Sequence, residues 1–173
     1  MTTSLSLPEI AVGRVLPAGL LAVPGRLPEM QDCLIHRVQQ QYPEALVVHR
    51  LDMATSGLMV LARSQAVQRA LSEAFASRAV SKEYVALLDG QLPDAAGSVA
   101  LPLMSDWLRR PRQKVDAAGK PALTEYRLLQ QQADGSRVLL TPVTGRTHQL
   151  RVHMLALGCP IVGDALYGGR AAP

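Results

Sequence analysis

Two short apolar runs, residues 46–48 and 58–62, flank a polar loop that contains Asp52. Apolar runs of this length between turn residues are typical of strands buried in a sheet. Small residues at positions 55–57 allow the backbone to turn tightly behind the carboxylate. The pattern predicts a functional loop held by a rigid sheet. It is also compatible with a structural role, in which the Asp52 side chain caps its own turn.

The remainder of the chain contains more strand-like segments than helical ones. Apolar residues at helical spacing predict a helix over 30–41, a second helix capped by Ser64, and a third that opens at Thr144 or Gly145 and stops at Gly158. Alternating or short apolar runs predict strands at 46–48, 57–62, 81–88, 99–103, 123–130 and 137–143.

The order of these segments favours the α+β class. The last two predicted strands are joined by Ala133-Asp134-Gly135, which is a hairpin signal. We therefore expect a mainly antiparallel mixed sheet with flanking helices. The length of 173 residues and a hydrophobic content of 48% suit one domain over residues 1–173.

The charge distribution indicates a polyanionic partner. The formal net charge is +4, and a basic cluster falls within six positions. Such a cluster is either a solvated loop or a surface that neutralises phosphates. Its members are Arg109, Arg110, Arg112 and Lys114.

The two cysteines, Cys33 and Cys159, are far apart and show no metal-ligand spacing. A disulfide framework or a zinc site therefore has no support from the sequence, and a reducing compartment is favoured. We find no signal peptide pattern and no apolar run long enough to span a membrane. A cytoplasmic protein without a membrane partner is expected.

Three motifs identify a family resemblance. They are His-Arg-Leu-Asp-x-x-Thr-Ser-Gly at 49–57, Lys-x-Tyr at 82–84, and Gly-Arg-Thr-His-Gln-Leu-Arg-Val-His at 145–153. In this order they resemble the signatures of the RluA family of pseudouridine synthases, over roughly residues 17–168. Within the family, the chain most resembles dual-specificity members that modify 23S ribosomal RNA and transfer RNA.

The resemblance implies an isomerase that needs no metal and no small-molecule cofactor. Its target uridine must be flipped out of the RNA stem-loop. By resemblance Asp52 is the attacking carboxylate, Arg151 orients and balances it, and Tyr84 stacks on the base. From the residues alone, a half-buried core position on a strand is favoured for Tyr84, and Arg151 also suits the solvated face of a helix.

Further residues are expected to bind the RNA. Arg50 would share one side of an alternating strand with Asp52 and support the flipped state. Leu150 suits either the core or the uracil pocket, whereas His148 and His153 are expected to be structural or to contact RNA rather than bind metal. The full predicted binding set is Arg50, His49, Leu150, Arg146, Lys82 and the basic cluster of Arg109, Arg110, Arg112 and Lys114.

The chain departs from the family pattern at both ends. Leu16 stands where the family carries a lysine, and the run 10–15 does not have the pattern of the expected strand. Relatives continue beyond the position of Pro173, so the N-terminal strand and the C-terminal strands are expected to be shortened or missing. The alternative function is therefore a non-catalytic remnant that binds RNA stem-loops. We expect a monomer in either case.

Overall fold

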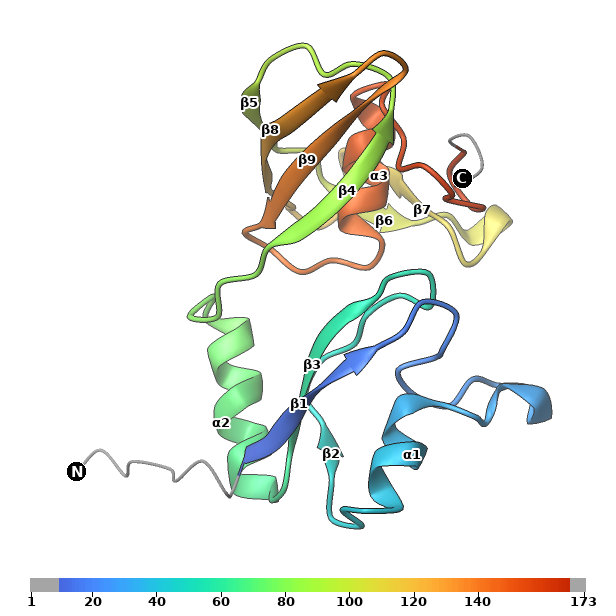
Figure 1. Ribbon diagram of the computed structural model, residues 1–173, viewed down its shortest axis with the longest axis vertical. Helices are drawn as coiled ribbons and strands as arrows, with labels where there is room; N and C mark the ends of the chain where they lie inside the picture. Colours follow the sequence, from blue (N-terminus) through green and yellow to red (C-terminus); the bar gives the residue numbers. More distant parts are fainter. Residues whose placement is uncertain (1–9, 169–173) are drawn as a thin grey trace. The chain divides into compact units, whose positions relative to one another are not determined.

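The computed structural model describes residues 10–168, with side chains described from Gly13 onward. The chain divides into two compact units, the first ending at Ala79 and the second beginning at Val80. Each unit combines antiparallel strands with one or two α-helices (Figure 1). The predicted α+β class is thus confirmed, and every pairing between the strands named below is antiparallel.

The first unit is built on a three-stranded sheet in the order β1-β3-β2. Its helices α1 and α2 lie beside this sheet, and the 3-10 turn η2 precedes α1 (Figure 1). The bounds are β1 Ile10–Leu16, β2 Leu46–Val47, β3 Gly57–Ala62, α1 Leu34–Gln39, α2 Gln65–Ala76 and η2 Pro28–Met30.

The core of this unit follows from alternation along β3. Met59 and Leu61 are buried on one face, while Leu58, which precedes them, is exposed and Val60 between them is only partly buried. The buried pair packs with apolar side chains from α1. As predicted, Ser64 caps α2, because its hydroxyl accepts the Val67 N–H at 3.3 Å.

Two predictions for the first unit were wrong. The run 10–15 is a strand, because pairing with β3 supplies the hydrogen bonds that its weak local pattern did not predict. The helix predicted over 30–41 is limited to α1. Residues just before it are held extended, since Leu34 N–H donates to the Leu21 carbonyl at 2.8 Å and Cys33 bridges the same residue.

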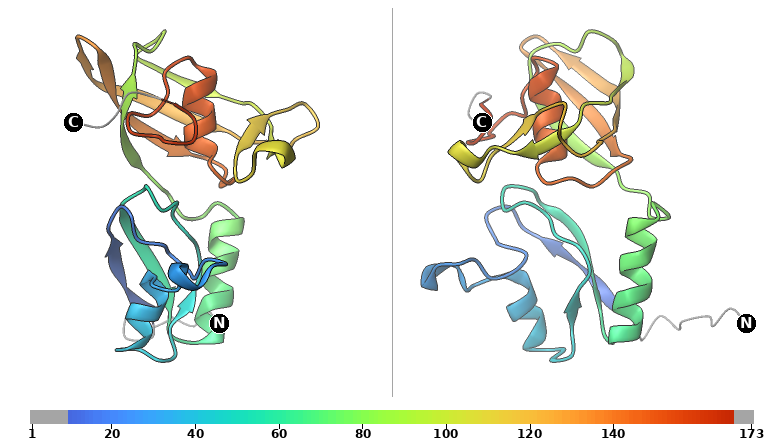
Figure 2. Two further views of the ribbon diagram at one scale, coloured as in Figure 1. Left: turned by 90° about the vertical axis from the view of Figure 1, so that its right-hand side faces the viewer. Right: turned by 180° about the vertical axis from the view of Figure 1, so that it is seen from behind.

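The second unit is built on a four-stranded sheet in the order β4-β9-β8-β5. Helix α3 covers one face of it (Figures 1 and 2). Met154 from this helix is buried in a cluster with sheet residues such as Leu140. The predicted hairpin at 133–135 joins β8 and β9. The bounds are β4 Tyr84–Asp89, β5 Ala96–Val99, β8 Thr124–Gln132, β9 Gly135–Pro142 and α3 Gln149–Ala156.

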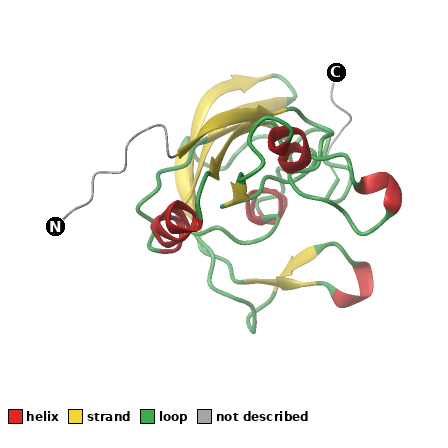
Figure 3. Ribbon diagram, turned by 90° about the horizontal axis from the view of Figure 1, so that it is seen from below, coloured by secondary structure: helices red, strands yellow, loops and turns green. Residues whose placement is uncertain are grey.

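A separate small hairpin carries the basic cluster. Strands β6 (Leu103–Ser105) and β7 (Gln113–Val115) pair with each other, and the 3-10 turn η3 (Trp107–Arg109) lies between them. Figure 3 shows this hairpin as a ribbon distinct from the larger sheet. The single strand predicted over 99–103 was wrong, because the segment divides between β5 and β6 around Pro102, which has no N–H to donate.

Helix α3 begins later than predicted. Residues 144–148 form a loop, and His148 occupies the position before the first helical residue in a left-handed conformation with φ 53°, without a side-chain capping hydrogen bond. The loop is held by Gln149, whose side-chain oxygen accepts from Thr144 and from the Arg146 N–H. Strand β4 likewise starts at Tyr84 rather than at residue 81.

Within residues 10–168, no helix combines the length and the apolar character that crossing a membrane requires. The same residues contain no group of three or more His, Cys, Asp or Glu side chains arranged to hold a metal ion. Cys33 and Cys159 are both buried free thiols.

Candidate functional site

The Asp52 loop is tied down by backbone hydrogen bonds. The Asp52 carbonyl accepts the Thr55 N–H at 2.8 Å, and the next carbonyl, that of Met53, accepts the Gly19 N–H at 2.7 Å. Gly19 adopts φ 90°, a left-handed conformation that suits glycine. The Asp52 side chain is half-exposed. A partly accessible carboxylate on an anchored loop meets the requirement for a preorganised reactive group.

His49 connects the Asp52 loop to β3 and α2. Its Nε2 atom accepts the Val60 N–H at 3.1 Å, and its ring stacks on Phe75 with centroids 4.6 Å apart. Because a backbone N–H only donates, Nε2 is unprotonated and the ring is neutral. The contacts join the loop to β3 and α2, so the structure places His49 as a support of the Asp52 loop.

The prediction that Arg50 shares one side of a strand with Asp52 is not supported by the structure. It assumed an alternating strand, but β2 ends at Val47 and residues 48–52 have no strand conformation. Leu51 packs against the core of the first unit, and Arg50 is exposed. Exposure of Arg50 is compatible with a contact to RNA.

Tyr84 and Leu150 meet at one apolar cluster in the second unit. Tyr84 begins β4 opposite Leu140, and both Tyr84 and Leu150 are half-buried against this cluster. The arrangement leaves part of each side chain accessible while the cluster fixes the rest. The buried members of the cluster are Leu88, Val99, Tyr126, Val138, Leu140, Met154 and Cys159.

The second and third motifs are brought together at Lys82 and Gly145. Lys82 is half-buried, and burial lowers the pKa of its ammonium group. A Cβ atom added at Gly145 would lie 3.8 Å from Lys82 Nζ. This distance is an ordinary van der Waals contact, so the Lys82 ammonium group lies beside the loop at Gly145.

Gln149 organises the third motif, although no role was predicted for it. Its oxygen accepts from the Thr144 hydroxyl at 2.7 Å and from the Arg146 N–H at 3.0 Å. Its nitrogen donates to the Leu123 carbonyl at 2.9 Å and to Thr124 Oγ1 at 3.0 Å. Arg146 itself is exposed, and its Nε donates to the Pro121 carbonyl at 3.0 Å. The network fixes the loop that carries Arg146.

Arg151 forms a paired contact with a residue that the motifs do not include. Its Nε and Nη2 atoms donate to the two carboxylate oxygens of Asp164, both at 2.7 Å. The side chains are 13% and 3% exposed, respectively. Burial raises the pKa of Asp164, but hydrogen bonds from Arg151 and two backbone N–H groups outweigh it and hold that pKa below its usual value. Asp164 is therefore ionised at neutral pH.

The basic cluster lies on the β6–β7 hairpin with exposed apolar side chains. Trp107 and Leu108 are 68% and 97% exposed, and the Arg110 guanidinium lies 3.5 Å from the centroid of the Trp107 ring. Arg109 pairs with Asp106 and Lys114 with Asp116, at 2.8 and 2.7 Å. The segment 106–116 holds four basic and two acidic side chains, so its formal charge is positive.

A protein-family model described as RNA pseudouridylate synthase matches residues 17–156 of the chain. The dual-specificity RNA pseudouridine synthase RluA of Escherichia coli strain K12 is 53% identical over 158 residues, covering 90% of this chain and 72% of that protein. The protein of the same name from Yersinia pestis is 52% identical over 153 residues, covering 87% and 74%.

Solved structures of related proteins share the fold. Human RNA Pseudouridylate Synthase Domain Containing 4 superimposes with a TM-score of 0.74 at 29% identity, over 92% of this chain and 66% of that one. Human RNA Pseudouridylate Synthase Domain Containing 1 gives the same TM-score at 30% identity, over 92% and 69%.

Proposed function

Because the chain belongs to the RNA pseudouridylate synthase family, we propose that it isomerises uridine to pseudouridine in structured RNA. The observation that carries this proposal is the extent of the family match, residues 17–156, which contains all three motifs. The match spans both compact units. We therefore propose that the two units together provide one catalytic domain.

The reaction is an internal transfer that leaves the composition of the RNA unchanged. The bond from ribose C1′ to uracil N1 breaks, the base rotates, and C1′ joins C5. The C5 proton is lost and N1 regains one, so no oxidant, reductant or cofactor is consumed. The protein has to supply a nucleophilic carboxylate, charge compensation and a pocket that retains the detached uracil.

Asp52 is the proposed nucleophile, acting at the sugar or at the base. Its anchored, half-exposed loop supports this role. Arg151 is proposed as the cation that balances the carboxylate in the reacting complex with RNA. A guanidinium offers donors along more than one edge, so an arginine that grips Asp164 can serve a second anion.

Tyr84 is proposed to stack on the flipped uracil, and Leu150 to line the same pocket. Both are half-buried against one apolar cluster, which holds a flat surface in place without covering it completely. Aromatic stacking does not distinguish one base from another, because every base presents a flat π-face. Selection of uracil therefore requires further polar contacts. The proposed binding set also includes Lys82, Arg146, Arg50 and His49. His49 contributes by supporting the Asp52 loop.

The RNA is proposed to be a stem-loop of transfer RNA or 23S ribosomal RNA, since relatives named for dual specificity are about half identical to the chain. The β6–β7 hairpin would contact the stem through phosphates, with Arg109, Arg110, Arg112 and Lys114 as donors. A monomer located in the cytoplasm remains our prediction from the sequence.

Tritium release from 5-tritiated uridine in a transfer RNA anticodon stem-loop tests the proposal, because forming the C1′–C5 bond displaces the C5 hydrogen. We expect release that proceeds to a plateau with one equivalent per target uridine. A chain that binds the stem-loop in a gel-shift assay but releases no tritium would refute catalysis and leave RNA binding alone.

A further inference from the structure

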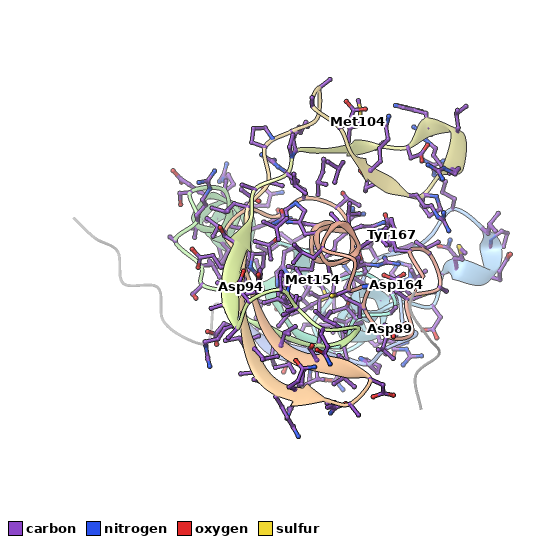
Figure 4. The ribbon with its side chains drawn as sticks, turned by 90° about the horizontal axis from the view of Figure 1, so that it is seen from above. Asp89, Asp94, Met104, Met154, Asp164 and Tyr167 are labelled. Atoms are coloured by element: carbon purple, nitrogen blue, oxygen red, sulfur yellow. The ribbon has the colours of Figure 1, made fainter. Side chains whose placement is uncertain are left out.

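A turn that follows the three motifs contacts Arg151 and His148, two residues of the third motif. It comprises residues 163–168, and its side chains Asp164 and Tyr167 lie beside helix α3 (Figure 4). Neither belongs to the motifs by which the family resemblance was identified. The polar atoms of both side chains contact the third motif.

The Asp164 carboxylate is fixed from two directions. Arg151 donates to both of its oxygens, and Oδ1 also accepts the backbone N–H groups of Leu166 at 2.9 Å and Tyr167 at 3.2 Å. The backbone contacts set the plane of the carboxylate. The two parallel contacts then set the plane of the Arg151 guanidinium.

Tyr167 restricts the same guanidinium and connects it to the basic hairpin. Its ring centroid lies 5.0 Å from Arg151 Cζ, within the range of a cation–π contact. Its hydroxyl lies 2.6 Å from His148 Nδ1 and accepts the Gln113 N–H of β7 at 2.7 Å. The turn therefore joins the start of α3, the Arg151 side chain and the β6–β7 hairpin.

A long arginine side chain normally loses rotamer freedom when it binds an anion, and this loss weakens the interaction. In this protein, contacts in the folded chain have already restricted the side chain. We propose that Asp164 is a positioning residue for Arg151 in the isomerisation, holding the guanidinium in the orientation that the reaction requires. The proposal rests on the proposed function, because it assigns Arg151 to the reaction.

The first test is a double-mutant cycle in single-turnover tritium release. Asp164→Asn keeps the side-chain volume but directs an amide nitrogen at one Arg151 donor, so we expect the rate to fall at least tenfold while stem-loop affinity stays within twofold. In an Arg151→Lys background the same change should have no further effect, because Asp164 would act through Arg151. An equal loss in both backgrounds would contradict positioning and indicate a general structural role.

The second test is a nuclear magnetic resonance measurement on the unmodified chain, independent of turnover. The Arg151 Nε–H signal, identified by its loss in Arg151→Lys, should exchange with water far more slowly than the Nε–H signal of Arg37. Arg37 is a matched comparison, because it grips Asp32 in the same paired manner at 2.8 and 2.6 Å, with both side chains more than half exposed. Equal exchange rates would overturn the proposal.

The two tests separate this proposal from the proposed function. A chain that never releases tritium would refute the isomerase, whereas the exchange rates would still decide whether Asp164 holds Arg151. Asp32→Asn serves as the control substitution in the rate assay, and we expect its rate to match the parent chain. Asp164→Glu retains the charge and should recover part of the rate lost in Asp164→Asn. No recovery would contradict a role for the carboxylate.

Discussion

The hydroxyl oxygen of Thr124 lies 2.9 Å from Nδ1 of His153, and both side chains are fully buried. Nε2 of the same ring lies 3.0 Å from the Leu101 carbonyl oxygen. Since a carbonyl only accepts, Nε2 carries the proton and Nδ1 accepts from Thr124. The ring is neutral in the folded protein, and burial lowers the pKa of His153.

This arrangement predicts a loss of stability in acid. In the unfolded chain His153 titrates near pH 6.5, whereas the folded protein takes up the proton only at lower pH. As the pH falls below 6.5, the unfolded state gains a proton that the folded state lacks, so the free energy of unfolding falls by up to about 1.4 kcal/mol per pH unit. Urea titrations between pH 5 and 8 measure how the free energy of unfolding depends on pH. His153→Gln should flatten this dependence, and an unchanged slope would contradict the assignment.

Gln149 should be required for stability as well as for the shape of the Arg146 loop. Gln149→Ala removes the acceptor of the Thr144 hydroxyl and of the Arg146 N–H, together with the donor to the Leu123 carbonyl, at a total cost of about 1–3 kcal/mol. Urea unfolding measures the loss. Gln132→Ala, at an exposed position on β8, is the control and should change stability by less than about 0.5 kcal/mol. Similar values for the two variants would be inconsistent with the network.

The basic hairpin should govern the salt dependence of RNA binding. Arg110→Ala removes a cation held on Trp107, so the slope of log affinity against log salt concentration should decrease by about 0.7–0.9 if one phosphate contact is lost. Lys114→Ala should have a smaller effect, because Lys114 already pairs with Asp116. Filter binding of a stem-loop at several salt concentrations gives the slopes. Arg69→Ala on α2 is the control, and a slope change as large for Arg69 would exclude a specific role for the hairpin.

Tyr84 should act through its ring rather than its hydroxyl. Tyr84→Phe retains the packing against the apolar cluster and should keep most of the tritium-release rate. Tyr84→Leu fills part of the same space without an aromatic face, and the loss of stacking should cost about 1–3 kcal/mol in kcat/KM. Single-turnover assays at subsaturating RNA compare the two. Equal activity of the leucine and phenylalanine variants would argue against stacking.

Local sequence signals predicted the elements whose determinants are close in the chain. Ser64 and the apolar spacing after it identified α2, and Ala133-Asp134-Gly135 identified the β8–β9 hairpin. Strand β1 was missed because its evidence lies in β3, more than forty residues later. Helix α3 was started too early because Gln149 folds the residues before it into a loop.

The candidate site was predictable only where it coincides with a motif. The roles that the motifs assign to Asp52, Tyr84 and Arg151 stay predictions, whereas Lys82 and Gly145, from separate motifs, are neighbours in the structure. Asp164 and Tyr167 were not assigned, since no local pattern tells which carboxylate a buried arginine will meet thirteen residues away. One sequence signal could have identified them. Both residues lie in a short segment bounded by Gly163 and Gly168, which follows the helix that carries Arg151.

Substitution of the proposed nucleophile is the most direct measurement. Asp52→Asn keeps the volume of the side chain but cannot attack, so tritium release from the anticodon stem-loop should fall by more than about 10³-fold while RNA binding persists. Asp94→Asn, an exposed carboxylate before β5, should leave the rate unchanged. Release by Asp52→Asn at the parent rate would contradict the central claim that this carboxylate carries out the isomerisation.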